Sequence, residues 1–188
     1  MIPKLKPNSN VLPIIRQHKD FLPKMFFEKL SNIVNGNNFQ WFFNNSSLDE
    51  TKAPFVKTDN FMFTHTFFRE EQGKASDWFD TFEPILYSIN EKVKVNKLMR
   101  MKLNLYTNQN KKVKQGSHCD ILDEKGQPLK DVNTALLNFT TCNGGTKIGN
   151  KTYNSNENEL IIFNNATKHS GIVQTNTQKR IVLNINWR

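Results

Sequence analysis

The sequence predicts a mainly β fold preceded by helices, a double-stranded β-helix of the jelly-roll type. Two stretches in the first half carry apolar residues at a helical period, and from residue 98 onward the apolar residues alternate, as in β-strands. Seven or eight strands after two helices are typical of a jelly roll. At 188 residues the chain suits one domain with a sizeable core. We therefore expect a single domain, 1–188, with a helix and strand support region at 1–97 and the barrel core at 98–188.

Two helices are expected in the support region. Residues 20–34 place apolar side chains on one face, with Pro23 in the first turn and Gly36 just beyond the end. A second helical pattern spans residues 76–93, and Pro84 within it either kinks the helix or starts a new segment.

The predicted strands have short apolar or alternating runs. They are residues 39–43, 61–68, 100–106, 134–141, 159–163, 171–173 and 180–187. Polar segments at 46–58 and 108–117 are predicted as loops. Because alternate side chains of a strand share a face, the pattern predicts two faces on each strand. Residues 100–106 place Arg100, Lys102, Asn104 and Tyr106 together, and the last strand places Arg180 opposite its apolar face.

The composition indicates a soluble globular protein. Fifteen Phe and three Trp predict an aromatic core, whereas the mean hydropathy of −0.62 predicts a very polar surface. No run approaches the roughly 18 apolar residues of a membrane span, and the first residues lack a signal-peptide pattern, so we expect a cytoplasmic protein without membrane contact. Cys119 and Cys142 are expected to stay reduced, and the sequons at Asn138, Asn150 and Asn165 to stay unmodified. The net charge of +9 is scattered, which favours a solvated surface over a nucleic-acid site.

The motif that points to chemistry is His118-Cys119-Asp120, followed downstream by His169. On a strand, His118 and Asp120 point to the same side and Cys119 points away. Two His and one carboxylate on one face of an octahedron leave open positions on a non-haem Fe(II). Arg180 follows His169 and opens an apolar run, where it can bind a carboxylate. By contrast, His65 has no acidic or His partner at ligand spacing and is expected to be structural, and His18 is expected to be a surface residue.

In this order, His118-x-Asp120, His169 and Arg180 resemble the Fe(II)- and 2-oxoglutarate-dependent dioxygenases. The surrounding residues are similar to the prolyl 4-hydroxylase branch of that family, of the small bacterial and viral type. The similar residues are Tyr106, the Asn143-Gly144-Gly145-Thr146 turn, Phe163 and Trp187. The resemblance covers residues 98 to 188 well and the first half in general plan.

The resemblance implies Fe(II), 2-oxoglutarate and O2 as cofactors and cosubstrates, with ascorbate as a supporting reductant. His118, Asp120 and His169 would bind the metal and carry catalysis. The far carboxylate of 2-oxoglutarate would pair with Arg180 and accept a hydrogen bond from Tyr106. Lys102 and Asn104, on the face of Tyr106, are pocket candidates. Asn138 stands near the position of a tyrosine that shares this carboxylate in many relatives, so it is a further cosubstrate candidate.

The leading hypothesis from the resemblance is hydroxylation of a protein or peptide, at a prolyl residue. Such a substrate would lie across the barrel mouth, against Arg100 and the loop from Pro54 to Asp59. A small-molecule hydroxylase would have a similar sequence. A nucleic-acid demethylase is a further alternative, although that branch has an arginine six residues after the 2-oxoglutarate arginine, where this chain has Asn186. The non-enzyme alternative is a jelly-roll binding module. The sequence gives no prediction of oligomeric state.

Overall fold

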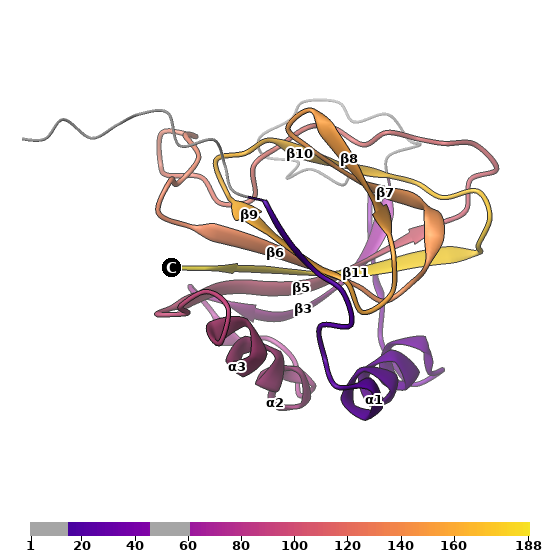
Figure 1. Cartoon of the computed structure of the whole chain (residues 1–188), viewed down its shortest axis with the longest axis horizontal. Coiled ribbons are helices and arrows are strands. Elements are labelled where there is room, and N and C mark those ends of the chain that lie inside the picture. Colours follow the sequence, from indigo (N-terminus) through magenta and orange to yellow (C-terminus); the bar gives the residue numbers. More distant parts are fainter. Residues whose placement is uncertain (1–14, 46–60) are drawn as a thin grey trace, which may run out of the picture.

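Two antiparallel β-sheets face each other, and three helices cover the outer face of the larger sheet (Figure 1). The computed structural model describes residues 15–45 and 61–188. Its architecture confirms the predicted jelly roll. The loop predicted at 46–58 and the substrate loop predicted at 54–59 lie outside the described residues.

The larger sheet has eight strands among the described residues. Their spatial order is β1 (Arg16–His18), β9 (Leu160–Asn164), β6 (Asn133–Asn138), β11 (Lys179–Trp187), β5 (Leu98–Thr107), β3 (Met62–Arg69) and β2 (Phe42–Asn44), with β4 (Gly73–Lys74) paired to β3. The smaller sheet has the order β10 (His169–Ile172), β7 (Cys142–Ile148) and β8 (Lys151–Ser155). The described strands therefore exceed the seven or eight expected, because β1, β4 and β8 were too short or too polar to be predicted and the glycines of β7 were predicted as a turn.

A non-strand segment extends the smaller sheet beyond β10. Lys114 pairs with Ile172 and His118 pairs with His169, both antiparallel. The backbone N–H of Gln115 also donates to the Gly171 carbonyl at 2.8 Å. The segment predicted as a polar loop thus follows β10 closely and carries His118 to the barrel interior. The prediction that His118 and Asp120 lie on a regular strand is wrong, because only His118 is paired.

The helices are α1 (Lys24–Asn35), α2 (Phe79–Phe82) and α3 (Pro84–Asn90). Pro84 starts α3 at a position where its missing N–H needs no partner, which confirms the second of the two predicted alternatives. α1 ends where the backbone N–H of Gly36 bonds to the Ile33 carbonyl. None of the helices in the described part of the chain has the length or apolar character to cross a membrane.

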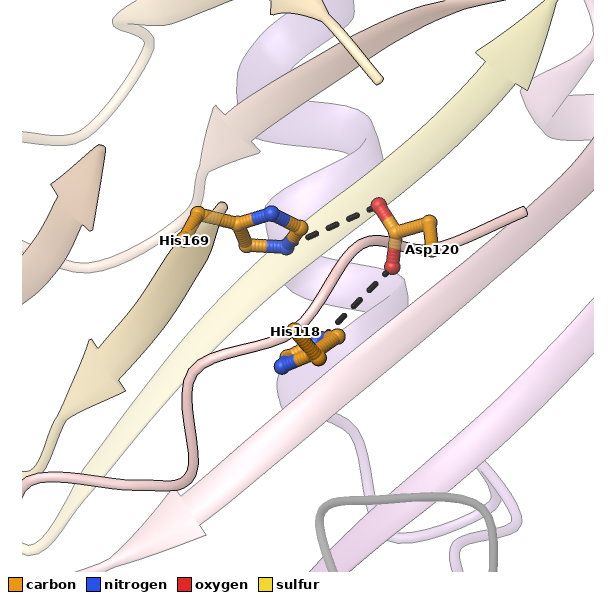
Figure 2. Close-up of side chains that lie close together, drawn as sticks. All are labelled: His118, Asp120 and His169. Atoms are coloured by element: carbon orange, nitrogen blue, oxygen red, sulfur yellow. Dashed lines mark ion pairs between the residues drawn. The ribbon is translucent and has the colours of Figure 1, made fainter. Parts of the chain in front are cut away.

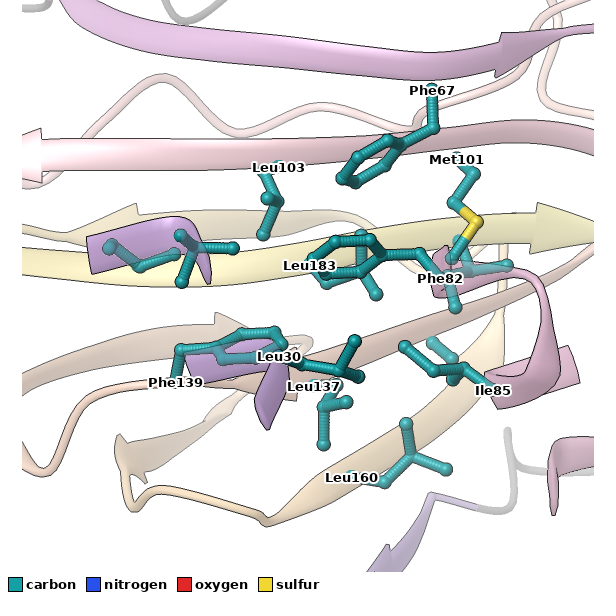
Figure 3. Close-up of a cluster of buried hydrophobic side chains, with 14 of the residues drawn as sticks. Leu30, Phe67, Phe82, Ile85, Met101, Leu103, Leu137, Phe139, Leu160 and Leu183 are labelled. Atoms are coloured by element: carbon teal, nitrogen blue, oxygen red, sulfur yellow. The ribbon is translucent and has the colours of Figure 1, made fainter. Parts of the chain in front are cut away.

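The main hydrophobic core lies between these helices and the larger sheet. Leu103 of β5 and Leu183 of β11 are cross-strand partners, and both pack into a cluster with Leu30 of α1 and Phe82 of α2 (Figure 3). Because side chains alternate along a strand, the other face of β5 and β11 points between the two sheets. That inner face carries Tyr106 and Val182, which belong to a second apolar cluster. The predicted two-faced strands are therefore present.

Two glycines predicted as a turn lie instead within β7, so that prediction is wrong. A Cβ on Gly145 would lie 2.2 Å from the Tyr153 carbonyl oxygen, and a Cβ on Gly144 would lie 2.8 Å from the Ile172 carbonyl oxygen. Real Cβ atoms do not approach this closely. Gly144 and Gly145 are needed because β8 and the end of β10 pass close to the backbone of β7. The strand predicted at 39–43 also differs, since β2 covers only Phe42–Asn44.

Candidate active site

His118, Asp120 and His169 converge between the two sheets, and Figure 2 shows both imidazoles facing the carboxylate. His118 Nε2 lies 3.8 Å from Asp120 Oδ1, and His169 Nε2 lies 3.6 Å from Asp120 Oδ2. One ligand atom from each residue lies within 4.8 Å of the other two. Three such atoms at this separation fit around one first-row divalent ion. Neither Cys119 nor His65 belongs to this group in the described part of the chain.

The backbone fixes the two imidazoles relative to each other. The N–H of His118 donates to the His169 carbonyl, and the N–H of His169 donates to the His118 carbonyl, both at 2.9 Å. Such a doubly bonded cross-strand pair places both side chains on one face of the sheet. The ring centroids of His118 and His169 are 4.5 Å apart. The two histidines therefore reach one point although 50 residues separate them in sequence.

Each imidazole directs its Nε2 at the carboxylate of Asp120. His118 Nδ1 lies 3.0 Å from the Gly116 carbonyl oxygen, so Nδ1 carries a hydrogen, and Nε2 is the ring nitrogen that faces Asp120. Burial lowers the pKa of His169 to about 4. The negative charge of Asp120 opposes this lowering, and the nearby His118 adds to it. The His169 imidazole is therefore uncharged at neutral pH, and its Nε2 is available as a metal ligand.

Asp120 stays ionised although its side chain is only 4% exposed. Arg100 Nη2 donates to Oδ1 at 2.6 Å, and the amides of Asn184 and Asn186 donate to Oδ2 at 3.0 and 3.2 Å. Burial alone would raise the pKa of this carboxyl group, but the charge of Arg100, the imidazoles and the Asn184 hydrogen bond together hold the pKa well below 3.8. Arg100, which the sequence predicts to contact substrate, has its Nη2 bound to Asp120 and its Nε bound to Asn186 Oδ1 at 3.0 Å.

A buried cation lies next to this cluster. Arg180 is 1% exposed, its Nη2 donates to Thr146 Oγ1 at 2.9 Å, and its guanidinium lies 5.3 Å from the Tyr106 ring centroid. Burial lowers the pKa of Arg180. None of the ion pairs among the described residues involves Arg180, and its Nε has no hydrogen-bond partner there. Since an unpaired buried charge is costly, this arrangement suits an anionic ligand.

A cavity connects the ligand cluster with the residues around Arg180. Its lining includes Lys102, Asn104 and Tyr106 from β5, together with Thr146 and all three candidate metal ligands. Burial raises the pKa of Tyr106, so its hydroxyl is protonated and able to donate at neutral pH. Gly171 faces this hydroxyl, since a Cβ there would lie 3.4 Å from the Tyr106 oxygen. The structure therefore brings three of the five predicted cosubstrate residues, Lys102, Asn104 and Tyr106, to one cavity. Arg180 does not line this cavity but contacts two residues that do, Tyr106 and Thr146.

Asn138 has other partners. Its Oδ1 accepts a hydrogen bond from Ser155 Oγ at 3.1 Å, and its Nδ2 lies 3.5 Å from the Glu159 carbonyl oxygen. The amide is 2% exposed and is absent from the lining of the cavity. Asn138 therefore supports the turn before β9 in this structure.

Several residues of the site carry no recognisable sequence signal. Thr146, Asn184 and Asn186 contact Arg180 or Asp120, but threonine and asparagine are common throughout the chain. The one available signal was the face periodicity of the last strand, which places Asn184 and Asn186 on the side of Arg180. Which acceptor they reach depends on the loop that brings Asp120 across the sheet.

Solved structures with a similar fold include 2-oxoglutarate- and iron-dependent enzymes. A 2OG-Fe(II) oxygenase-family protein from Burkholderia pseudomallei has a TM-score of 0.64 at 8% identity, covering 93% of this chain and 84% of that one. The viral collagen prolyl hydroxylase of Paramecium bursaria Chlorella virus-1, in complex with 2-oxoglutarate, has a TM-score of 0.56 at 12% identity, covering 92% of this chain and 93% of that one. The non-haem α-ketoglutarate-dependent epimerase SnoN of nogalamycin biosynthesis has a TM-score of 0.62 at 10% identity, covering 93% of this chain and 77% of that one.

No protein-family model matches the chain, and no curated protein sequence does. At these identities the likeness to solved structures defines the fold. The chain has the double-stranded β-helix fold of the 2-oxoglutarate- and Fe(II)-dependent oxygenases, the prolyl hydroxylases among them, and a His-Asp-His cluster lies inside its barrel.

Proposed function

We propose that the chain is an Fe(II)- and 2-oxoglutarate-dependent dioxygenase that hydroxylates a prolyl residue within a protein or peptide. The observation that carries the proposal is the convergence of His118, Asp120 and His169 next to the buried, unpaired Arg180. A binding module of the same fold has no need for two converging imidazoles, an ionised carboxylate and a buried cation in one place. The fold of the oxygenases agrees with this chemistry.

His118, Asp120 and His169 would hold the iron. Their chemistry fits Fe(II), because two imidazole nitrogens and one carboxylate oxygen leave positions for further ligands. Iron bound there, together with 2-oxoglutarate and O2, supplies the oxidising power for hydroxylation. The protein groups hold the metal and keep the carboxylate ionised: Arg100, Asn184 and Asn186 all donate to Asp120.

Arg180 would bind the carboxylate of 2-oxoglutarate that is remote from the metal. A guanidinium pairs with a carboxylate through two parallel hydrogen bonds, which fix the direction of the bound acid. Thr146 already holds one guanidinium nitrogen, and the Tyr106 ring packs against the group. The protonated Tyr106 hydroxyl then adds a neutral donor on the cavity side. Lys102 and Asn104 line the same cavity and are proposed to complete the pocket.

The prolyl substrate is supported by the residues that resemble prolyl 4-hydroxylases and by the fold shared with a viral collagen prolyl hydroxylase. A polypeptide has to lie across the mouth of the barrel, because the interior is filled by the second apolar cluster. Main-chain hydrogen bonds at the rim would supplement one inserted side chain.

The test is succinate formation with Fe(II), 2-oxoglutarate and ascorbate in the presence of a proline-rich peptide library, followed by mass spectrometry for added oxygen. We expect turnover stimulated by peptide, oxygen on prolyl residues, and loss of both in His118→Ala. Turnover that no peptide stimulates would count against the prolyl substrate while leaving the oxygenase. In a parallel reaction with methylated oligonucleotides, loss of the methyl group as formaldehyde, with no oxygen added to any peptide, would identify the demethylase alternative.

A small-molecule substrate is the second candidate, because the epimerase SnoN also shares this fold. The same assay distinguishes it when the peptide library is replaced by cell-extract metabolites below about 1 kDa. Modification of a metabolite without modification of any peptide would favour this candidate.

A further inference from the structure

The turn between β9 and β10 contains one asparagine whose side chain is completely buried and fully bonded. Asn165 is 0% exposed. Its Oδ1 accepts hydrogen bonds from the backbone N–H groups of Asp120 at 3.1 Å and Ile121 at 2.9 Å. Its Nδ2 donates to the carbonyl oxygens of Ile121 at 2.8 Å and Leu129 at 3.0 Å. A primary amide has two donors and one oxygen with two lone pairs, so every hydrogen-bonding position of Asn165 is used.

These four bonds define the amide orientation without ambiguity. A flipped amide would direct its NH2 group at two backbone N–H groups and its oxygen at two carbonyls, all repulsive. The backbone of Asn165 is held as well, because its N–H donates to the Val132 carbonyl at 2.9 Å. Asn165 therefore links three segments, the ligand segment at 120–121, the loop at 129 and the turn leading to His169.

Asp120 needs such a support because its segment lacks a regular strand partner. His118 is paired with His169 through two backbone hydrogen bonds, but the pairing ends there. The first backbone bonds after His118 that hold the ligand segment are those to the Asn165 side chain. Besides the bonds to Asn165, the described structure holds the backbone of 120–121 by one bond, from the Leu129 N–H to the Ile121 carbonyl at 3.1 Å, so the Asn165 amide provides three of the four backbone contacts of this segment.

We propose that Asn165 is a positioning residue for the metal site, which sets the place of Asp120 relative to His118 and His169. The inference rests on the proposed metal-binding function. The side-chain oxygen and nitrogen of Asn165 are both bonded to the backbone, so Asn165 is not itself a ligand and acts through Asp120. Three asparagines then support this one ligand, Asn165 at its backbone and Asn184 and Asn186 at its carboxylate.

The test compares Asn165→Ala with Asn158→Ala. Asn158 offers a matched control, since it is also buried and also holds a backbone segment: its Oδ1 accepts from the Leu22 N–H and its Nδ2 donates to the Leu22 carbonyl. That contact lies at the start of α1, far from the site in the fold. Metal affinity is measured by anaerobic titration with Mn(II), read by calorimetry and by electron paramagnetic resonance.

We expect Asn165→Ala to weaken Mn(II) binding between about 10-fold and 100-fold, the usual effect of removing an outer-shell partner of a ligand. Asn158→Ala should keep the wild-type affinity even if it lowers the melting temperature. Affinity in folded Asn165→Ala within about twofold of wild type would overturn the inference. If wild type itself binds no Mn(II), the proposed function fails, and the inference fails with it.

A measurement on the wild-type protein covers the case in which Asn165→Ala does not fold. Hydrogen exchange followed by NMR in the metal-free protein should show slow exchange at the amides of Asp120 and Ile121, because Asn165 bonds both. Exchange at these amides as fast as at exposed loops would refute the proposal without any variant.

Discussion

Asp120 uses almost all of the hydrogen-bonding capacity of its carboxylate before any metal is bound. An ionised carboxylate offers about four lone-pair sites. Arg100 takes one on Oδ1, and Asn184 and Asn186 take two on Oδ2. The remaining site is on Oδ1, the oxygen that faces His118. At the scale of single residues, the hydrogen bonds from Arg100, Asn184 and Asn186 therefore leave one site on Oδ1 of Asp120 free for a metal.

Replacing Arg180 is expected to weaken 2-oxoglutarate binding far more than metal binding. In Arg180→Ala the acid loses a buried charged partner, which costs on the order of 2 to 5 kcal/mol. This corresponds to roughly 30-fold or more in affinity. Calorimetric titration of 2-oxoglutarate and of Mn(II) measures both, and Arg180→Lys should recover part of the loss because it restores the charge. Equal losses for both ligands would instead indicate a damaged barrel.

His65 is expected to make stability depend on pH. Its imidazole lies between Phe39 and Phe67, with Nδ1 2.7 Å from the Gln40 carbonyl oxygen and Nε2 2.7 Å from Ser76 Oγ. Burial lowers the pKa of His65 below 6.5, with the Gln40 hydrogen bond opposing this in part. The expectation that His65 is structural agrees with these contacts.

Because the folded protein holds this imidazole neutral, it binds fewer protons than the unfolded chain at mildly acidic pH. The contribution of His65 to stability is therefore complete above about pH 6.5 and is lost as the pH falls toward the lowered pKa of the folded state. Urea unfolding of metal-free protein at pH 7.5 and pH 5.5 should show a smaller pH difference in His65→Phe than in wild type. An identical difference in both proteins would contradict the assignment.

At the scale of elements, β7 has no room for a side chain at Gly145. Gly145→Ala would place a methyl group 2.2 Å from the Tyr153 carbonyl oxygen of β8. We expect a loss of about 1 to 3 kcal/mol in the free energy of unfolding, as for other overpacked sites, because β7 and β8 have to move apart.

Gly36→Ala serves as the graded control for this strand. The added Cβ there would lie 3.2 Å from the Asn32 carbonyl oxygen, which a small shift relieves. Its effect on the unfolding midpoint should be clearly smaller. If both variants had equal midpoints, close packing of β7 against β8 would not explain the two glycines.

At the scale of the whole molecule, metal binding should stabilise the fold, because segments distant in sequence bring the three ligands together only in the folded chain. Anaerobic Fe(II) or Mn(II) at 100 times the dissociation constant should add about 2.7 kcal/mol to the free energy of unfolding. A thermal melt with and without chelator measures the effect, and His169→Ala is the control that should not respond. A chelator-insensitive melting temperature in wild type would argue against a metal site in this protein.

Much of the site was predictable from residue types and their order. His118, Asp120, His169 and Arg180 form an ordered set at spacings that resemble a known family. Strand periodicity predicted that Arg180 lies opposite the apolar face of the last strand, and the resemblance predicted that Tyr106 faces into the barrel. The helices α1 and α3 were also predictable, because a proline lies at each start and Gly36 lies at one end. These features depend on local backbone geometry, which neighbouring residues determine.

The tertiary structure alone decided the supports of the site. Arg100 reaches Asp120 across 20 residues, Asn165 across 45 and Asn186 across 66. Their residue types carry no signal, since arginine and asparagine occur throughout the chain and hydrogen bond to whatever lies within reach. Gly144 and Gly145 similarly depend on the path of β8 and β10. The sequence thus determined the ligands, whose chemistry is specific, whereas the fold determined their partners, because a hydrogen bond depends on distance in space and not along the chain.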